Sequence, residues 1–253
     1  MMLKSAGLAL ALCLASATPS FAGDGAELNI LGFSADSRYF AFEQFGEQDG
    51  SGYAFDEIFV VDLTKDAWVK DSPIRVLGKD DEKLGVVMQQ ARAKYAALEK
   101  TYAITSPVRV LARSPVYEVI EDRKTITFDT WYMSSEFGST PDVPDTLKEV
   151  RYVLSVAEKP LPRPSTCPED MGDDYKGFTL KLKSIKDGSE RELVSDAAIP
   201  NSRGCPFGYD VQAVVDGFSD TQTDQVVAIL GVYSLGFEGK DLRYMAVPFK
   251  LKP

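Results

Sequence analysis

The sequence predicts a mostly β fold with antiparallel, propeller-like or sandwich-like sheets and one docked α-helix at about residues 80–102. Three observations support this prediction. Short apolar or alternating segments, separated by turn residues, recur along most of the chain. One segment alone has apolar residues at helical spacing. No period of about 20 to 50 residues repeats throughout the chain, which separates it from a regular repeat protein.

Residues 1–22 have the features of a signal peptide. Lys4 precedes the apolar run SAGLALALCLASA, and Ser20 and Ala22 are small residues at the two positions that a signal peptidase reads. We therefore expect cleavage after Ala22, which leaves residues 23–253 as a single β-rich exported domain. The run is shorter than the roughly 20 residues that span a bilayer. A buried N-terminal helix and a membrane anchor are the alternatives.

Three strands are predicted near the start of the mature chain. Segments 26–33, 38–45 and 57–63 are apolar, and the second is apolar on both faces, as expected of a strand that is covered on both sides. Ser and Asp residues at 34–37 favour a turn because their side chains bond the local backbone. The segment TKDAWV then turns into a candidate fourth strand.

Residues 80–102 form the only predicted helix. Acidic residues lead it and Lys100 lies near its end, an arrangement that suits the helix dipole. A propeller blade has no room for this helix, so we expect it to pack outside a sheet or to interrupt a repeat. The apolar positions at helical spacing are Leu84, Val87, Met88, Ala91, Tyr95 and Leu98.

The rest of the chain is predicted to be β. A hairpin at 177–196 is indicated by Asp187-Gly188 at its turn. The other predicted elements are a hairpin at 116–133 and strands at 148–158, 208–218, 225–234 and 242–249.

Two cysteines remain in the mature chain. Cys13 leaves with the leader, whereas Cys167 and Cys205 lie in loops rich in Pro and Gly. An even number in an exported chain favours a disulfide between them. Closing a loop of this length stabilises a fold by roughly 4 kcal/mol in the chain-entropy description. Two free thiols or an envelope redox pair are the alternatives, although the Cys-x-x-Cys spacing usual for a redox pair is absent.

The composition excludes several classes of function. The formal charge is −10 without a basic block, which argues against a nucleic-acid partner. The chain has no histidine, which excludes Ser-His-Asp and Cys-His catalysis and His-containing zinc sites. No phosphate-binding loop, dinucleotide motif or Gly-x-Ser-x-Gly elbow is present. The sequence therefore assigns no catalytic residue, metal ligand or cofactor, and favours a protein that is not an enzyme.

The weaker candidates are carboxylates and exposed aromatic residues. The acidic clusters 80–82 and 169–174 have the oxygen ligands that calcium prefers, although neither has the ligand spacing of an EF-hand. Two carboxylates also suffice for a glycosidase, but with 38 acidic residues any pair fits. Trp131 and Tyr132 lie at a predicted strand end before a polar loop, where they are candidates to bind a sugar or a peptide.

The N-terminal segment resembles a blade of the TolB-type and WD40-like propellers. The matching residues are Phe33, Ser34 and Asp36, the strand RYFAF, and the strand EIFVVDL that ends in Asp62 and Leu63; Ser37 stands where those repeats usually have Gly. Residues 216–251 partly repeat this pattern. If the two ends of the chain pair, the sheet closes without exposed edges.

Residues 27–251 as a whole resemble a family of uncharacterised predicted secreted bacterial proteins. The segments that carry this resemblance are ILGFSADSRYFAFEQFGEQDGSGYAFDEIFVVDL, NSRGCPFGYDV and FSDTQTDQVVAILGVYSLGFEGKDLRYMAV. The resemblance implies export and assigns no catalytic residues.

The leading hypothesis is a periplasmic or secreted, non-enzymatic protein that binds an envelope protein or polymer. It rests on the predicted export, the blade-like units and the missing catalytic motifs. A carboxylate-based glycan hydrolase and a calcium-stabilised structural module are the alternatives.

Overall fold

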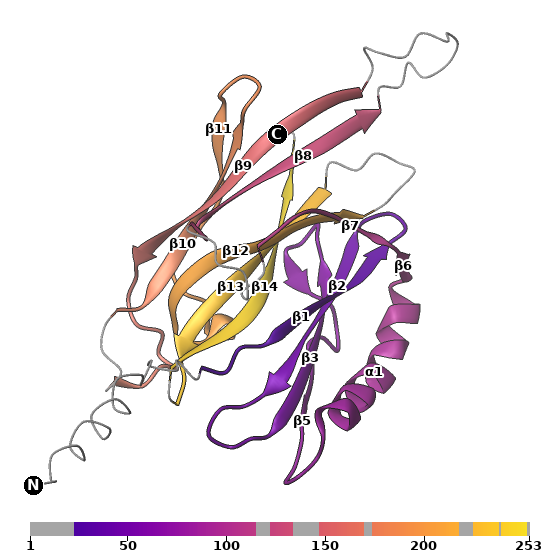
Figure 1. Ribbon diagram of the computed structural model, residues 1–253, viewed down its shortest axis with the longest axis vertical. Coiled ribbons are helices and arrows are strands. Elements are labelled where there is room, and N and C mark those ends of the chain that lie inside the picture. Colours follow the sequence, from indigo (N-terminus) through magenta and orange to yellow (C-terminus); the bar gives the residue numbers. More distant parts are fainter. Residues whose placement is uncertain are drawn as a thin grey trace, which may run out of the picture.

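The computed structural model describes residues 23–114, 122–133, 147–169, 174–217, 225–237 and 239–251 (Figure 1). Within these ranges the chain forms three antiparallel β-sheets and one long α-helix, which confirms the predicted mostly β class. The sheets stack face to face, so the sandwich-like form is the one that fits, and the resemblance to propeller blades is not confirmed.

The first sheet has the strand order β4-β3-β2-β1-β6, with β5 pairing beside β4 along β3. Its first three strands form the antiparallel meander that the N-terminal sequence predicts. Its strands are β1 (Glu27–Ser34), β2 (Tyr39–Glu47), β3 (Ala54–Asp62), β4 (Ala67–Trp68), β5 (Ile74–Leu77) and β6 (Ile104–Ser106).

The second and third sheets each have four strands. The second sheet has the order β11-β10-β9-β8 and the third has the order β14-β13-β12-β7. The second consists of β8 (Thr125–Met133), β9 (Leu147–Pro160), β10 (Lys176–Ser184) and β11 (Glu190–Ser195). The third consists of β7 (Val108–Arg113), β12 (Pro206–Gly217), β13 (Gln225–Leu235) and β14 (Lys240–Lys250).

The third sheet is the central layer of the molecule. In β13, Val226, Ala228 and Leu230 face the second sheet, whereas Val227 and Ile229 face the first sheet, and all five are fully buried. Because a strand covered on both faces needs apolar residues on both, residues 226–232 of β13 form a buried run without a polar side chain. The described layers therefore follow the order second sheet, third sheet, first sheet, helix (Figure 1).

The helix α1 (Leu84–Thr101) packs on the face of the first sheet that points away from the third sheet (Figure 1). Val87, Ala91, Tyr95 and Leu98 are its buried residues, all of them in the predicted apolar set. The helix begins later than predicted, because Asp81 has a positive φ of 61° and the acidic residues form a turn before the first helical residue.

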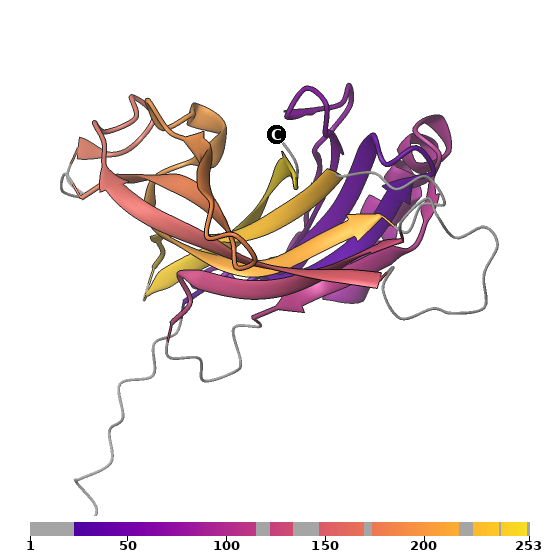
Figure 2. The same ribbon diagram turned by 90° about the horizontal axis from the view of Figure 1, so that it is seen from above.

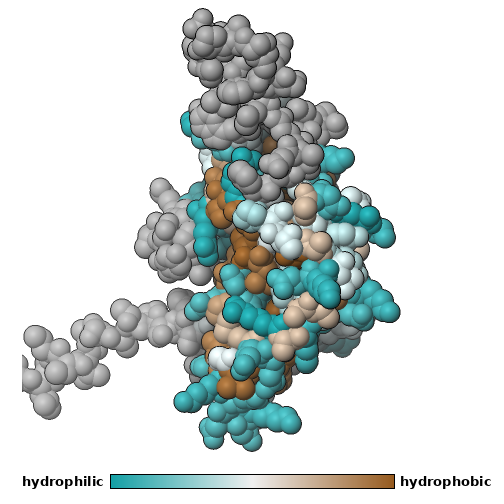
Figure 3. Space-filling view, turned by 90° about the vertical axis from the view of Figure 1, so that its right-hand side faces the viewer, coloured by the Kyte–Doolittle hydropathy of each residue, from teal (hydrophilic) through white to brown (hydrophobic). Residues whose placement is uncertain are grey.

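Figure 3 shows the side of the molecule that lies on the right in Figure 1. On this side, hydrophobic residues form a central band between hydrophilic margins.

The turn between β1 and β2 follows the predicted chemistry. Ser34 Oγ donates to Asp36 at 2.6 Å, and the Asp36 carboxylate accepts the Arg38 N–H at 3.1 Å. Ser37 adopts a φ of 55°, the left-handed conformation for which propeller repeats usually use Gly. These local bonds hold the first two strands in register.

Two further expectations need correction or qualification. Among the described residues, the one β-bridge between the two chain ends joins Gly25 to Leu242 in parallel, and β1 and β14 belong to different sheets, so pairing of the ends does not close a sheet. The hairpin predicted at 116–133 is described only in part: β8 is a single strand paired with β9, and residues 115–121 lie outside the described ranges. The hairpin predicted at 177–196 is confirmed as β10 and β11.

Candidate functional site

A cleft of about 650 Å³ lies beside strand β14, the edge strand of the third sheet. Side chains of β2, β3, β4 and β5 form one wall, and the loop that contains the short helix η2 (Asn201–Arg203) forms the other. The volume lies within the range of about 300 to 1,000 Å³ that is usual for ligand sites. Its position between two layers makes it the candidate functional site.

The wall formed by the first sheet is aromatic. The rings of Phe42 and Phe59 stack with their centroids 4.8 Å apart, and Trp68 packs on Phe59 at 5.8 Å. Phe42 and Phe59 face the cleft because side chains alternate along a strand, and their neighbours Ala41 and Ile58 face α1. Trp68 is 42% exposed, so an aromatic ring is open to a ligand.

A polar network crosses this aromatic wall. The Glu57 carboxylate accepts from Arg75 Nε at 2.7 Å and from Gln44 Nε2 at 2.6 Å. The other end of Gln44 accepts the Tyr244 N–H at 2.6 Å, so this side chain joins the first sheet to β14. The Arg75 guanidinium also lies 5.7 Å from the centroid of the Trp68 ring. Glu57 is thus held in a structural ion pair, and Trp68 and Arg75 form one amphipathic surface.

The mouth of the cleft has a carboxylate on one side and a guanidinium on the other. Asp66 lies in the turn between β3 and β4 with a φ of 48°, a conformation that Asp tolerates better than most residues. Loss of hydration raises the pKa of the Asp66 carboxyl, and the positive charge of Arg203 from the opposite wall opposes this effect. The residue as a whole is exposed, so Asp66 is accessible at the entrance even though its surroundings reduce the hydration of its carboxyl.

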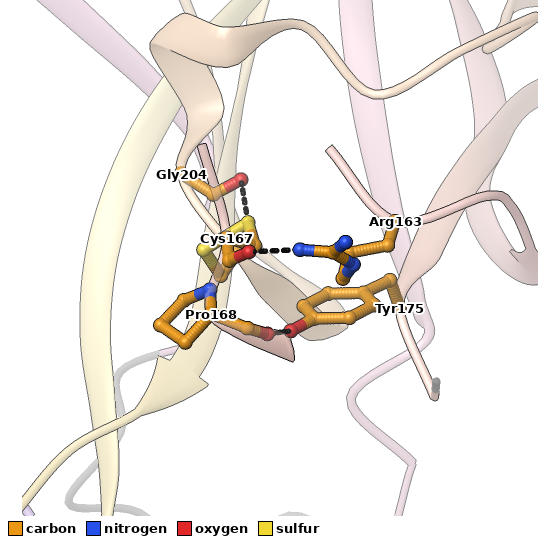
Figure 4. Close-up of a disulfide and its surroundings, with 6 residues drawn as sticks. Arg163, Cys167, Pro168, Tyr175 and Gly204 are labelled. Atoms are coloured by element: carbon orange, nitrogen blue, oxygen red, sulfur yellow. Dashed lines mark hydrogen bonds between the residues drawn. A yellow bond between two sulfur atoms is a disulfide. The ribbon is translucent and has the colours of Figure 1, made fainter. Parts of the chain in front are cut away.

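The opposite wall is held by a disulfide between Cys167 and Cys205, the pair that the sequence predicts (Figure 4). Their Cα atoms are 5.7 Å apart. Figure 4 shows the Arg163 side chain donating to the carbonyl of Cys167, and the Tyr175 hydroxyl donating to the carbonyl of Pro168 at 3.0 Å. Because Tyr175 is fully buried, these contacts fix the loop on a small core of its own.

Arg203 fastens the same loop to the second sheet. Its guanidinium forms an ion pair with Asp196 and lies 4.8 Å from the centroid of the Phe178 ring. It also lies 5.8 Å from the centroid of the Tyr209 ring. Only 11% of the Arg203 side chain is exposed, so most of this residue is used to position the wall of the cleft.

A second polar cluster lies under α1, on the far face of the first sheet. Arg92 donates from Nε and Nη2 to the two carboxylate oxygens of Glu43, at 2.8 and 2.7 Å, and Asn29 donates to Glu43 at 2.8 Å. Arg92 lowers the pKa of Glu43 against the opposing effect of its burial. Burial and the charge of Glu43 raise the pKa of the neighbouring Asp56 to about 8. Asp56 and Glu43 are fully buried, so this carboxyl pair is not a ligand site.

The sequence-predicted binding and metal candidates are not part of the described cleft. Trp131 and Tyr132 belong to β8, but their side chains lie outside the described residues. In the cluster 80–82, Asp80 accepts from the Tyr53 hydroxyl and Glu82 accepts from Gln90. Residues 170–173 lie outside the described ranges. Among the described residues, no three acidic or cysteine side chains are grouped as metal ligands.

Sequence reasoning did not identify Trp68, Arg75 and Arg203 as cleft residues. A signal for Trp68 was available, since it follows the polar turn TKDA in a segment too short to bury a large side chain. The two arginines carry no comparable signal. They reach the cleft from chain positions far apart, because the first sheet and the η2 loop lie on opposite sides of it.

No helix in the described ranges is both long enough and apolar enough to cross a membrane. In comparisons with known proteins, one family model matches residues 41–250, under the description "Predicted secreted protein (DUF2259)". Curated proteins and solved structures gave no match.

Proposed function

Because this chain belongs to the family described as predicted secreted protein (DUF2259), we propose that it is an exported binding protein whose cleft holds a partner of the cell envelope. The observation that carries this proposal is the cleft beside β14, with its exposed Trp68. An exposed aromatic ring next to fixed polar groups is the usual composition of a binding surface.

The two walls of the cleft support binding to a preformed site. One wall is fixed by the packed rings of Phe42, Phe59 and Trp68, and the other by the disulfide and Arg203. A site that is already rigid loses little conformational entropy when its ligand binds. The lack of histidine and of nucleophile motifs favours binding over catalysis.

Site-specific photo-crosslinking tests this function. A photoreactive side chain replaces Ala67, an exposed residue of the cleft, in the complete chain produced in a bacterial host. We expect an adduct in the envelope fraction, of discrete size for a protein partner and of dispersed size for a polymer. The matched control carries the same group at Ala97, which is exposed on α1 away from the cleft.

Two results would contradict the proposal. One is the absence of an adduct from Ala67, or the same adducts from Ala67 and Ala97. The other is release of reducing ends when the purified protein is mixed with peptidoglycan or envelope polysaccharide. That release would favour the alternative of a glycan hydrolase.

A further inference from the structure

We propose that the occupant of the cleft is an extended polypeptide segment that pairs with the free edge of β14 as an additional strand. This inference rests on the proposed function of the cleft as a binding site. Strand addition at a sheet edge is a common mode of peptide recognition, in which main-chain hydrogen bonds supply the affinity.

Three hydrogen bonds identify the outward-facing backbone groups of β14. The Leu242 N–H donates to the Asp24 carbonyl at 2.8 Å, and the Leu242 carbonyl accepts from Ala26 N–H at 3.1 Å. The Tyr244 N–H points the same way, to Gln44. Because backbone direction alternates along a strand, Ala246 and Pro248 also direct their backbone groups away from β13.

The free part of this edge is bounded at both ends. Leu242 is covered by the chain's own residues 24–26, and Arg191 donates to the carbonyl of Lys250. Between these limits, in the part of the chain that the structure describes, β14 has a strand partner only on the β13 side. The open row consists of the carbonyls of Tyr244, Ala246 and Pro248 and the N–H of Ala246. Pro248 has no backbone N–H, so it leaves no unpaired donor at this edge position.

A short piece of the chain itself already pairs with this edge. Residues 24–26 lie parallel to β14 and use both backbone groups of Leu242. A partner segment would continue the same row toward Pro248. It would pair with the backbone groups that residues 24–26 leave open.

The first sheet provides a surface for the side chains of such a strand. Phe59, Val61 and Trp68 line the cleft beside the edge of the third sheet. A strand placed next to β14 widens the third sheet and covers these residues. Because its side chains alternate between the two faces, every second one would contact the aromatic wall. The partner is therefore an extended segment with apolar residues at alternating positions.

A second copy of this chain is a poor occupant, because the edge is recessed. Seen from above, the third sheet lies between two raised segments, the turns after β3 in violet and the η2 loop in orange (Figure 2). The same recess in the other copy would keep two β14 edges apart. A single extended segment, in contrast, fits between the raised walls.

Backbone methylation of a peptide provides the decisive test. The probes are capped octapeptides that alternate valine or phenylalanine with serine, glutamate or lysine, titrated against the mature protein by calorimetry. For a peptide that binds, two isomers are made, one N-methylated at the apolar residues and one at the polar residues. Since alternate N–H groups of a strand point to opposite sides, we expect one isomer to lose at least about tenfold in affinity and the other to bind nearly unchanged.

The position is checked at Ala246. We expect its amide to show a shifted resonance and slower hydrogen exchange in the complex, and Ala246→Pro to weaken binding while Ala246→Ser does not. The Pro variant keeps the pairing with β13, because the N–H of Ala246 points away from it. Equal loss or equal retention for the two methylated isomers would overturn the proposal, as would no binding across the panel up to about 1 mM. If these tests fail while Ala67 still gives a crosslink, strand addition is rejected and the proposed binding function of the cleft stands.

Discussion

Asp56 shows how one buried carboxyl can set the pH response of the fold. Both of its side-chain oxygens are buried, and neither has a hydrogen-bond partner among the described residues. Protonation gives it a hydrogen that Glu43 can accept, and burial together with the charge of Glu43 raises its pKa to about 8. The group is therefore protonated in the folded protein at a pH where the unfolded chain has lost that proton.

We expect this group to make the protein less stable as the pH rises. Its folded pKa of about 8 lies above its ordinary value of 3.8. Its stabilising contribution is thus fully present below about pH 4 and is lost as the pH rises toward 8, because the folded state binds more protons in that window. Asp56→Asn keeps a hydrogen-bond donor for Glu43 and removes the titration. Melting temperatures measured from pH 5 to about 9 should fall less steeply for this variant than for the parent.

The exposed Glu192 of β11 provides the control for this prediction. Glu192→Gln removes a carboxylate from the surface and should leave the slope unchanged. An unchanged slope for Asp56→Asn would show that the carboxyl pair does not control the pH response.

At the scale of elements, the η2 loop is the part of the candidate site that depends most on a single crosslink. The disulfide joins residues 38 positions apart and ties this loop to the one that follows β9. The small core around Tyr175 and Ile199 adds packing, but it contains few residues. The position of one wall of the cleft therefore depends on the redox state of the two cysteines.

Replacing both cysteines by serine should lower the free energy of unfolding by roughly 4 kcal/mol, because the unfolded chain gains the entropy of an open loop. For a chain of this size the melting temperature should fall by about 10 °C. Calorimetry with and without reductant checks this, and mass spectrometry should link Cys167 to Cys205. The double variant should not respond to reductant. A parent protein that also ignores reductant would contradict the role of the bridge, provided that its two thiols are shown to be free.

At the scale of the whole molecule, the third sheet couples the other layers. Ile229 belongs to the core shared with the first sheet, and Leu230 to the core shared with the second. Both residues are fully buried and adjacent in β13. Since each outer sheet shares a buried core with the third, we expect the described domain to unfold as one unit.

Ile229→Ala and Leu230→Ala should each lower the free energy of unfolding by about 2 to 5 kcal/mol, through lost burial and the cavity left behind. Denaturant unfolding followed by Trp fluorescence and by far-UV circular dichroism should give one coincident transition for both variants. Ile185→Ala, at a position 49% exposed, is the control and should change stability by less than about 0.5 kcal/mol. Two separate transitions, each shifted by only one of the variants, would contradict coupling through β13.

The local elements were predictable because their causes lie within a few residues. The helical spacing from Val87 to Leu98 predicted α1, and Asp187-Gly188 predicted the turn between β10 and β11. The segment 38–45, apolar on both faces, predicted a strand covered on both sides, and it forms β2 with five consecutive buried residues. Two loop cysteines in a chain expected to be exported predicted the disulfide.

The sequence by itself therefore determined the β-rich class, the single long helix and the crosslinked loops, since short-range pattern and residue chemistry control these features. The tertiary structure decided that the sheets stack instead of forming blades, that Trp68 and Arg203 line one cleft, and that β14 keeps a free edge. Pairing between sheets joins residues distant in the chain. An amphipathic pattern predicts that one face of an element is buried, but it does not predict which other element covers that face.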